Sequence, residues 1–577
     1  MTRQALQDLV VAFQAGRLTR RQLMQRAAAL GISASAVGAV VGRSAHVAAA
    51  AQGDTSGLVT VATEQVATWT RNFNPFSPDP RWPTTNGIYE PLFVYNTISG
   101  EIVPWLATEW AFSADNLTLT FTTRPNVTWH DGKPFTARDV AYTLNLMKQN
   151  TALLGASRTA LDVVSKVEAT NDTTVAVTFS EVYTVGLYDI GTQNIVPEHI
   201  WSTVADPVNE PNATPIGSGP FGPVPVFQDQ YYEVHKNPTY WQEGKPAFEG
   251  FRFPAFPTND AANLATLNGE IDWASNFIPD IEATFVARDP ENNHYWFPPT
   301  GATVHLYLNT MTPPFDNADV RKAVSMAINR EQITTIAMYD YTNPSDSTGL
   351  SEAYPNWKNA EAADAEWVTN VADQANVLLD GAGLTRSGDV RQLPDGTPME
   401  YQLNVVTGWS DWVQACEIMS RNLADVGITV TVQPYEYATW FDQLQKGNFT
   451  MSIGGSESGA TPFNFFRGVM SSQTKEPIGT ISALNWHRFS VPEADQLLAD
   501  FAATSDTAQQ QQIANQLQLL YEQHAPAVPL FPGPQWGEFS TLRFEGFPSD
   551  ENPYAILSCY APESILVMME IKPKAAQ

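Results

Sequence analysis

The side chains best suited to chemistry are tryptophans that stand where predicted strands give way to loops. The chain of 577 residues contains 16 Trp. Trp409 and Trp412 follow the strand-like run QLNVV and a Thr-Gly turn, and a helical pattern begins beside them. An indole offers a flat apolar face on which a ring-shaped ligand can stack, and strand ends are where open α/β sheets expose ligand loops. We therefore expect Trp409 and Trp412 to contact a ligand.

A second group of candidates follows the first predicted strand, which begins at Leu58. Trp69 is accompanied there by Gln65 and Asn72, whose amide groups can hydrogen-bond to ligand hydroxyls. Because large aromatic residues also fill protein cores, packing is the alternative for any of these tryptophans. We expect ligand contact for Gln65, Trp69 and Asn72.

Other tryptophans leave the choice between cleft and core open. Trp273 ends the run LNGEIDW beside Asn276, and Trp536 lies in the run PLFPGPQWGEFS. Trp440 stands at helical spacing from Leu444 and is interpreted as packing. We retain Trp273, Asn276 and Trp536 as candidate ligand-binding residues.

The usual catalytic motifs are absent from the sequence. The 8 His are scattered and form no His-Glu-x-x-His pair, no phosphate-binding Gly-x-x-x-x-Gly-Lys loop occurs, and the run GSESG places Glu457 where a nucleophile elbow needs serine. We expect neither catalytic residues nor a cofactor. A carboxylate pair for glycoside cleavage is recognised by distance rather than by spacing, so a secreted glycoside hydrolase stays open as an alternative.

Charge and cysteine content exclude further classes. Asp and Glu number 61 against 32 Lys and Arg, which gives a formal charge of −29 and argues against nucleic acid as a partner. Cys416 and Cys559 are far apart and have no zinc-type spacing, so no metal site is expected. The sequence leaves open whether they form a disulfide or remain buried thiols.

The first 51 residues differ in composition from the rest. Six Arg stand there against one acid, Asp8, and the adjacent Arg20 and Arg21 precede a small apolar stretch, residues 27–41, which is too short to span a bilayer comfortably. Small residues at 48–51 supply cleavage positions. The segment resembles a twin-arginine export signal, with an amphipathic helix as the alternative. No cysteine precedes Cys416, so we expect an exported protein that is not a lipoprotein.

The remaining chain shows an irregular alternation of strand and helix patterns. Strand-like runs cover residues 117–123 and 174–179, and helical spacing of apolar residues covers 137–148 and 320–328. No repeat of fixed period is visible. These features predict an α/β fold.

Several separated segments resemble family 5 of the extracellular solute-binding proteins, the oligopeptide, dipeptide and oligosaccharide receptors of ABC importers. The densest is NVTWHDGKPFTARDVAYTLNLMK, residues 126–148, in which His130 belongs to a tight turn and Thr136 can cap the next helix. The other segments stand in family order at 88–110, 217–227, 235–241, 264–274, 306–333 and 375–384.

The resemblance implies a two-lobed fold like that of type II periplasmic binding proteins (the large cluster C), with a discontinuous first lobe that carries an inserted subdomain. Carried onto this chain, the first lobe covers 52–88, 217–306 and 529–577, the subdomain 89–216, and the second lobe 307–528. The ligand would lie between lobes that close around it. The expected partners are a small ligand and membrane-embedded ABC permease subunits, with the protein itself a monomer.

Within this family, peptide receptors often present a Trp-x-x-Asp-Tyr run whose aspartate pairs with the ligand's ammonium group. The corresponding stretch here, MSIGGSESGATPFNFF, places Ser458 at that position and Glu457 beside it. A buried ammonium without a carboxylate partner is unfavourable, so this departure favours an oligosaccharide, such as a β-linked gluco- or xylo-oligosaccharide, over a peptide unless Glu457 substitutes. Glu457 and Ser458 are the last two candidate ligand contacts. A third alternative for the function is a chaperone-like or signalling receptor.

Overall fold

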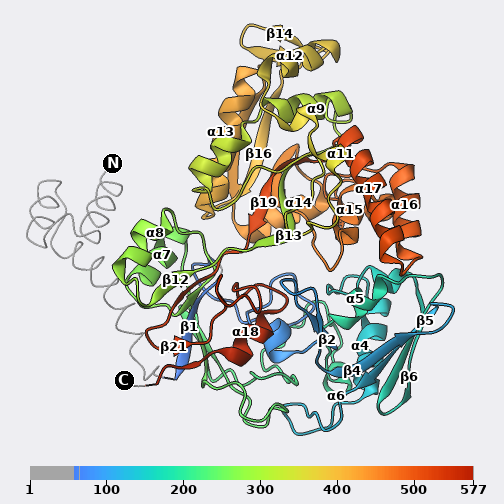
Figure 1. Ribbon diagram of the computed structural model, residues 1–577, viewed down its shortest axis with the longest axis vertical. Helices are drawn as coiled ribbons and strands as arrows, with labels where there is room; N and C mark the ends of the chain where they lie inside the picture. Colours follow the sequence, from blue (N-terminus) through green and yellow to red (C-terminus); the bar gives the residue numbers. More distant parts are fainter. Residues whose placement is uncertain (1–56, 64, 576–577) are drawn as a thin grey trace, which may run out of the picture. The chain divides into compact units, whose positions relative to one another are not determined.

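The computed structural model describes residues 57–63 and 65–575. The predicted export leader, residues 1–51, lies outside this part of the chain. The described residues form a two-lobed α/β fold in which three sheets position most of the helices (Figure 1).

The first lobe is built on a seven-stranded sheet whose strands come from distant parts of the sequence. Its central strand β1 pairs in parallel with β11, and β20 pairs antiparallel with β11. Helix α7 (Asn259–Leu267) begins with the side chain of Thr258 accepting a hydrogen bond from the Ala261 N–H. In spatial order the strands are β12 (Asn293–Tyr295), β20 (Glu538–Ser540), β11 (Trp273–Ala274), β1 (Leu58–Ala62), β10 (Gly250–Pro254), β9 (Tyr231–His235) and β8 (Val226–Gln228).

A four-stranded antiparallel sheet occupies part of the predicted inserted subdomain, with helix α4 (Ala137–Gln149) packed against it. Thr136 and Asp139 form a reciprocal capping box at the start of α4, which confirms the predicted cap. The alternating burial of strands β5 and β7 explains their pattern in the sequence. The elements of this region are β2 (Phe93–Tyr95), β3 (Ile102–Pro104), β4 (Ala107–Phe112), β5 (Thr118–Thr123), β6 (Val164–Asn171), β7 (Thr174–Phe179), α5 (Gly186–Gly191) and α6 (Glu198–Trp201).

The second lobe surrounds a five-stranded sheet in which β16 is flanked by two parallel partners, β17 and β18. The strands in spatial order are β17 (Thr429–Tyr435), β16 (Glu400–Val406), β18 (Met451–Gly455), β13 (Pro299–Leu308) and β19 (Val528–Pro534). The longer helices are α9 (Ala318–Ala327), α12 (Ala372–Gly381), α13 (Ser410–Asp425), α14 (Tyr437–Lys446), α15 (Phe463–Met470), α16 (Pro492–Ala502) and α17 (Thr507–His524), and α18 (Ser564–Glu570) follows in the first lobe.

Two paired strands carry the chain between the lobes. β13 and β19 run antiparallel, from the pair Pro299 and Pro534 to the pair Leu306 and Val528. β13 therefore extends across the predicted boundary at 306 and 307, since its first residues already pair within the five-stranded sheet. The domain boundaries as a whole stay a prediction.

The start of the predicted subdomain is held by one buried carboxylate, Glu90. It accepts hydrogen bonds from Trp105 Nε1 (2.6 Å), Tyr240 Oη (2.7 Å), Trp241 Nε1 (3.1 Å) and Ser218 Oγ (2.7 Å). Burial raises the pKa of Glu90 from 4.5 to about 7, although these four donors oppose the shift. Glu90 thus joins the outgoing chain to residues from the returning chain.

We expect Glu90→Ala to lower the free energy of unfolding by about 3–5 kcal/mol, because three buried donors and one half-buried donor lose their acceptor at once. Urea denaturation followed by tryptophan fluorescence measures the change. Glu249→Ala is the matched control, since the Glu249 side chain is 62% exposed and forms a surface ion pair with Lys236. Equal effects of the two substitutions would contradict the role assigned to Glu90.

Candidate functional site

A cavity of about 650 Å³ lies between the two lobes. Its walls come from three places: the carboxyl ends of strands in the first-lobe sheet, the carboxyl ends of strands in the second-lobe sheet, and two irregular segments at 78–86 and 559–564. This is the position at which open α/β sheets bind ligands.

The first-lobe wall follows from the pairing of three strands. β1 and β11 are parallel, with Ala62 opposite Ala274, so Thr63 and Ser275 leave the sheet at the same edge. β20 is antiparallel to β11, so the residues before it, including Trp536, reach that edge too. The wall contains Thr63, Gln65, Ser275, Asn276, Phe277, Gln535 and Trp536.

The second-lobe wall is aromatic. Like the first-lobe wall, it is formed by residues that leave paired strands at one edge of a sheet. β16 and β17 are parallel, with Val406 opposite Tyr435, so the loops that follow them meet at one edge. Trp409 packs edge-on against Trp412, with ring centroids 5.0 Å apart at 88°, and lies 5.9 Å from the ring of Tyr437. All three line the cavity. Trp409 and Trp412 are half-buried, so part of each indole is accessible.

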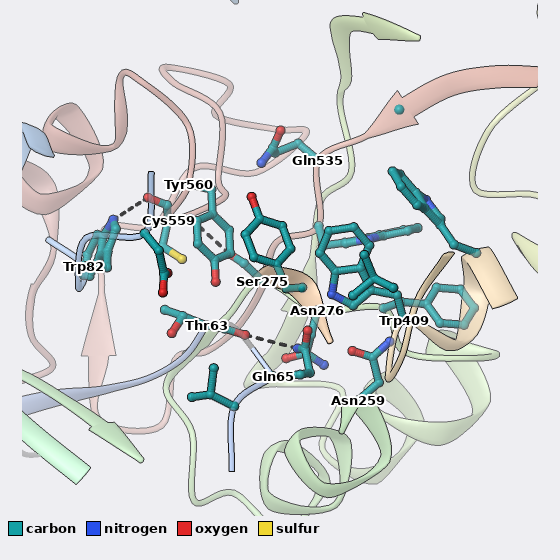
Figure 2. A pocket seen from close by; sticks show the side chains of 18 of the residues that line it. Thr63, Gln65, Trp82, Asn259, Ser275, Asn276, Trp409, Gln535, Cys559 and Tyr560 are labelled. Carbon is teal, nitrogen blue, oxygen red and sulfur yellow. Dashed lines mark hydrogen bonds between the residues drawn. The ribbon is translucent and has the colours of Figure 1, made fainter. Parts of the chain in front are cut away.

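The cavity has two ends that lie apart (Figure 2). Trp409 stands at one end, and Trp82 and Cys559 stand at the other. Trp82 is buried and its indole N–H donates to the carbonyl of Cys559 over 2.6 Å. An extended ligand therefore fits this space better than a compact one.

Neutral hydrogen-bonding groups dominate the polar part of the first-lobe wall. Thr63 Oγ1 and Asn276 Oδ1 are buried and have no hydrogen-bond partner among the described residues. Buried polar atoms in folded proteins are normally paired with protein, water or ligand. Gln65 uses its amide N–H for the carbonyl of Thr63 (3.2 Å) and Gln535 uses its own for Ser558 Oγ (3.0 Å), so their amide oxygens can still accept hydrogen bonds.

Among the described residues, the charged side chains that line the cavity are Asp79, Arg81, Asp411 and Glu436. Arg81 is 2% exposed, forms an ion pair with Asp79, and lies over the ring of Trp69. Asp411 is 3% exposed, and no Lys, Arg or His of the described chain pairs with it. Burial raises the pKa of the Asp411 carboxyl to about 6, against the effect of backbone N–H groups in the first turn of α13.

Five of the predicted ligand-binding residues come together at this cavity. They are Gln65, Asn276, Trp409, Trp412 and Trp536. Trp536 packs against Phe277 with ring centroids 5.4 Å apart. Trp440, interpreted as packing, is 4% exposed and donates to Ser452 Oγ.

Two of the predicted tryptophans lie in the core of the first lobe instead. Trp69 is 4% exposed, donates its indole N–H to the carbonyl of Phe253 (3.0 Å) and packs edge-on against Tyr232. Trp273 is fully buried and donates to the carbonyl of Leu557 (2.8 Å). Neither lines the cavity, because β11 directs the Trp273 side chain into the core and the loop after β1 folds Trp69 back over β9 and β10.

Three other predicted residues are used away from the cavity. Asn72 stabilises a local turn by donating to Ser77 Oγ (2.9 Å) and to the carbonyl of Asp79 (3.0 Å). Ser458 is exposed, and its carbonyl accepts a hydrogen bond from Asn464. Burial raises the pKa of the Glu457 carboxyl, and the positive charge of Arg467 opposes that increase. None of the three lines the cavity.

Some cavity residues were not predicted from the sequence. Asp411 lies between the two predicted tryptophans in the sequence. The pattern that could have identified it as a cavity residue is an acidic residue soon after a strand and a Gly turn. Asn259 begins α7 and reaches Ser410 Oγ of the other lobe over 3.4 Å. Tyr437 occupies the same place after β17 that Trp409 occupies after β16. Arg81 and Tyr560 lie in irregular segments whose path no local pattern predicts.

Cys416 and Cys559 are both buried and are not joined by a disulfide. Across residues 57–63 and 65–575, no His, Cys, Asp or Glu side chains cluster in a group of three that could hold a metal ion. In the same residues, no helix is both long enough and apolar enough to cross a membrane.

The fold and the inter-lobe cavity define the class as a two-lobed α/β binding protein. The family model described as bacterial extracellular solute-binding proteins, family 5 Middle, matches residues 101–476. The chain belongs to family 5 of the bacterial extracellular solute-binding proteins. It is therefore a substrate-binding component of an ABC importer, and proteins of this family act outside the cytoplasm.

Curated relatives span several ligand classes. The chain is 26% identical over 403 residues to a nickel-binding periplasmic protein of Escherichia coli, covering 68% of this chain and 75% of the relative. It is 22% identical to the periplasmic oligopeptide-binding protein OppA of Salmonella typhimurium, covering 78% and 83%. Family membership alone does not select among these ligands.

Solved structures share the fold. A periplasmic oligopeptide-binding protein of Thermotoga maritima, crystallised with mannohexaose, superposes with a TM-score of 0.84 at 24% identity and covers 91% of this chain and 100% of its own. NikZ of Campylobacter jejuni, in complex with Ni(L-His), superposes with a TM-score of 0.75 at 18% identity, covering 90% and 99%.

The raised pKa of Asp411 predicts a pH-dependent effect of its removal. A carboxyl whose pKa rises from 3.8 to about 6 on folding contributes stability that is complete below the lower value and is lost as the pH increases through the higher one. Asp411→Asn never ionises, so its stability relative to the parent should increase between about pH 4 and pH 8, by about 1–3 kcal/mol.

Thermal unfolding of both proteins across that pH range measures the difference. Glu417→Gln, an exposed position on the same helix, is the control. A difference between Asp411→Asn and the parent that stays constant with pH would contradict the burial argument.

Proposed function

We propose that this protein captures an oligosaccharide in the inter-lobe cavity and delivers it to an ABC permease, with β-linked gluco- and xylo-oligosaccharides as the first ligands to test. The observation that carries the proposal is the pairing of two unlike walls. The half-buried indoles of Trp409 and Trp412 stand on one side, and the neutral amides and hydroxyls of Gln65, Asn276 and Thr63 stand on the other.

These walls suit the two faces of a sugar ring. The C–H face of a pyranose is apolar and stacks on aromatic rings, while its hydroxyls donate to and accept from amide and hydroxyl groups. Thr63 Oγ1 and Asn276 Oδ1 lack protein partners among the described residues and would be paired by ligand hydroxyls. The separation of the Trp409 end from the Trp82 end favours a chain of sugars. The Thermotoga maritima relative holds mannohexaose in the same fold.

The place at which peptide receptors of the family bind an ammonium group argues in the same direction. Ser458 occupies the predicted position and is exposed, and Glu457 does not line the cavity. A peptide amino terminus would therefore find no carboxylate there.

An oligopeptide or dipeptide is the second candidate ligand. Asp411 is a buried carboxylate on the second-lobe wall and Arg81 is a guanidinium on the first-lobe side, so a zwitterion could pair with both. Curated relatives include putative peptide-binding proteins of ABC transporters in Brucella. Against this, Arg81 already forms an ion pair with Asp79.

The amino-terminal segment bears on where the protein meets its ligand. We infer that residues 1–51 direct export through the twin-arginine pathway and are removed, that no lipid anchor is attached, and that the protein acts as a monomer. The adjacent arginines at 20 and 21 and the lack of any cysteine before Cys416 support this route.

Cello- or xylo-oligosaccharides should raise the melting temperature, whereas di- to pentapeptides should not, because a ligand that binds only the folded state stabilises it by mass action. Thermal shift with both panels makes the comparison, and titration calorimetry gives the affinities. Stabilisation by peptides alone would reverse the assignment. Release of shorter sugars during incubation would favour the glycoside hydrolase reading.

Trp409→Ala should weaken binding of the active sugar by at least about 1 kcal/mol, because a stacking surface is lost. Trp357→Ala is the matched control: Trp357 is also half-buried in the second lobe but does not line the cavity, so its removal should reduce stability and leave affinity unchanged. If Trp409→Ala binds as tightly as the parent, Trp409 packs without contacting the ligand.

A further inference from the structure

A second contact joins the two lobes away from the ligand cavity. It is formed by Tyr183 and Thr184, which precede α5, by Asp189 within α5, and by Arg467 on α15. None of these four residues lines the cavity. We call them the inter-lobe latch. Figure 1 shows α5 beside α15 and α16. Hydrogen bonds from Thr184 to Ala502 and from Arg467 to Tyr183 establish the contact.

The first half of the latch is a set of hydrogen bonds from Thr184 to carbonyl groups at the end of α16. Thr184 donates its backbone N–H to the carbonyl of Ala502 (2.8 Å), and its hydroxyl lies within reach of the carbonyls of Ala502 (3.1 Å) and Thr504 (2.8 Å). Ala502 is the last residue of α16, whose terminal carbonyls have no partner inside their own helix. A residue of one lobe thus caps a helix of the other.

The second half of the latch is the buried guanidinium of Arg467 with its partners. Arg467 Nη1 donates to Tyr183 Oη over 2.8 Å and lies 3.5 Å from Asp189 Oδ2. The side chains of Arg467 and Asp189 are 11% and 7% exposed. Burial disfavours the guanidinium charge, but Tyr183, Asp189 and Glu457 outweigh it and raise the Arg467 pKa. Phe463 contributes packing, since its ring lies under the guanidinium and 6.2 Å from the ring of Tyr183.

Burial of these groups depends on the two lobes being together. Separating α5 from α15 would leave Arg467 and Asp189 without each other and would expose the end of α16 to water. A hydrogen bond from a charged donor is stronger than one between neutral groups, so the contact can shift a two-state equilibrium between separated and closed lobes.

We propose that the inter-lobe latch sets the ligand affinity of the distant cavity by stabilising the closed arrangement of the lobes, without touching the ligand. This rests on the proposed capture of ligand between the lobes. The closed form is a minority in the free protein and the majority once ligand is bound. Affinity then scales with the stability of the closed form, and the scaling factor is the same for every ligand.

Arg467→Gln and Tyr183→Phe test the latch from its two sides. Each should weaken binding of every sugar that the parent binds by one common factor, about 10-fold for Arg467→Gln, through faster dissociation. The double variant should be no weaker than Arg467→Gln alone, because both substitutions remove the same contact. Unchanged affinity, or losses that differ from sugar to sugar, would overturn the proposal.

Arg391→Gln is the matched control for a destabilised lobe. Arg391 is 1% exposed and bonds to Asp380 and to Asn376 within the second lobe. It should therefore lower the melting temperature without changing affinity. If it weakens binding as much as Arg467→Gln does, the effect comes from general loss of stability and the latch is refuted.

A measurement without ligand separates failure of the latch from failure of the sugar assignment. Spin labels at Glu181→Cys and Thr507→Cys, both exposed positions on the two sides of the contact, report the distance between the lobes, and the native thiols are buried. Pulsed electron paramagnetic resonance should show a short-separation population in the free parent that Arg467→Gln removes. An identical distance distribution in both proteins would refute the latch whatever the cavity binds.

Discussion

The antiparallel pairing of β13 with β19 is the interaction on which the site depends. These strands belong to the five-stranded sheet, and their far ends, at Pro299 and Pro534, lead into the first lobe. β13 and β19 therefore connect the two lobes beside the cavity. Val304 of β13 and Phe531 of β19 line the cavity, so the same pair that connects the lobes also forms part of the cavity wall.

Buried ionisable groups lie where distant parts of the chain meet. Glu90 ties the start of the predicted subdomain to the returning chain through three donors, and Arg467 meets Tyr183 and Asp189 across the lobes. Burying a charge is unfavourable unless its partners are in place. Such groups therefore favour one relative placement of the segments over others, which apolar contacts alone do less well.

The division of chemistry between the two walls explains how one fold can serve many ligands. Strand pairing fixes where the loops leave the sheets, and the side chains on those loops then decide what is bound. Here the second lobe offers the indoles of Trp409 and Trp412, and the first lobe offers amides and hydroxyls together with the indole of Trp536. NikZ in complex with Ni(L-His) and an oligopeptide-binding protein in complex with a nonapeptide share this fold.

The sequence by itself determined the fold class, the family and several local features. Thr136 caps its helix as predicted, and Trp409 and Trp412 reach the cavity because a helix after a parallel strand must start at the sheet's carboxyl edge. Only the tertiary structure decided that Trp69 and Trp273 lie in the core and that Glu457 lies away from the cavity, since the same residue types occur in cores and in binding sites. Asp411 and Arg81 also emerged only in three dimensions. Local pattern indicates whether a segment forms a strand or a helix, whereas burial and pairing depend on residues hundreds of positions away.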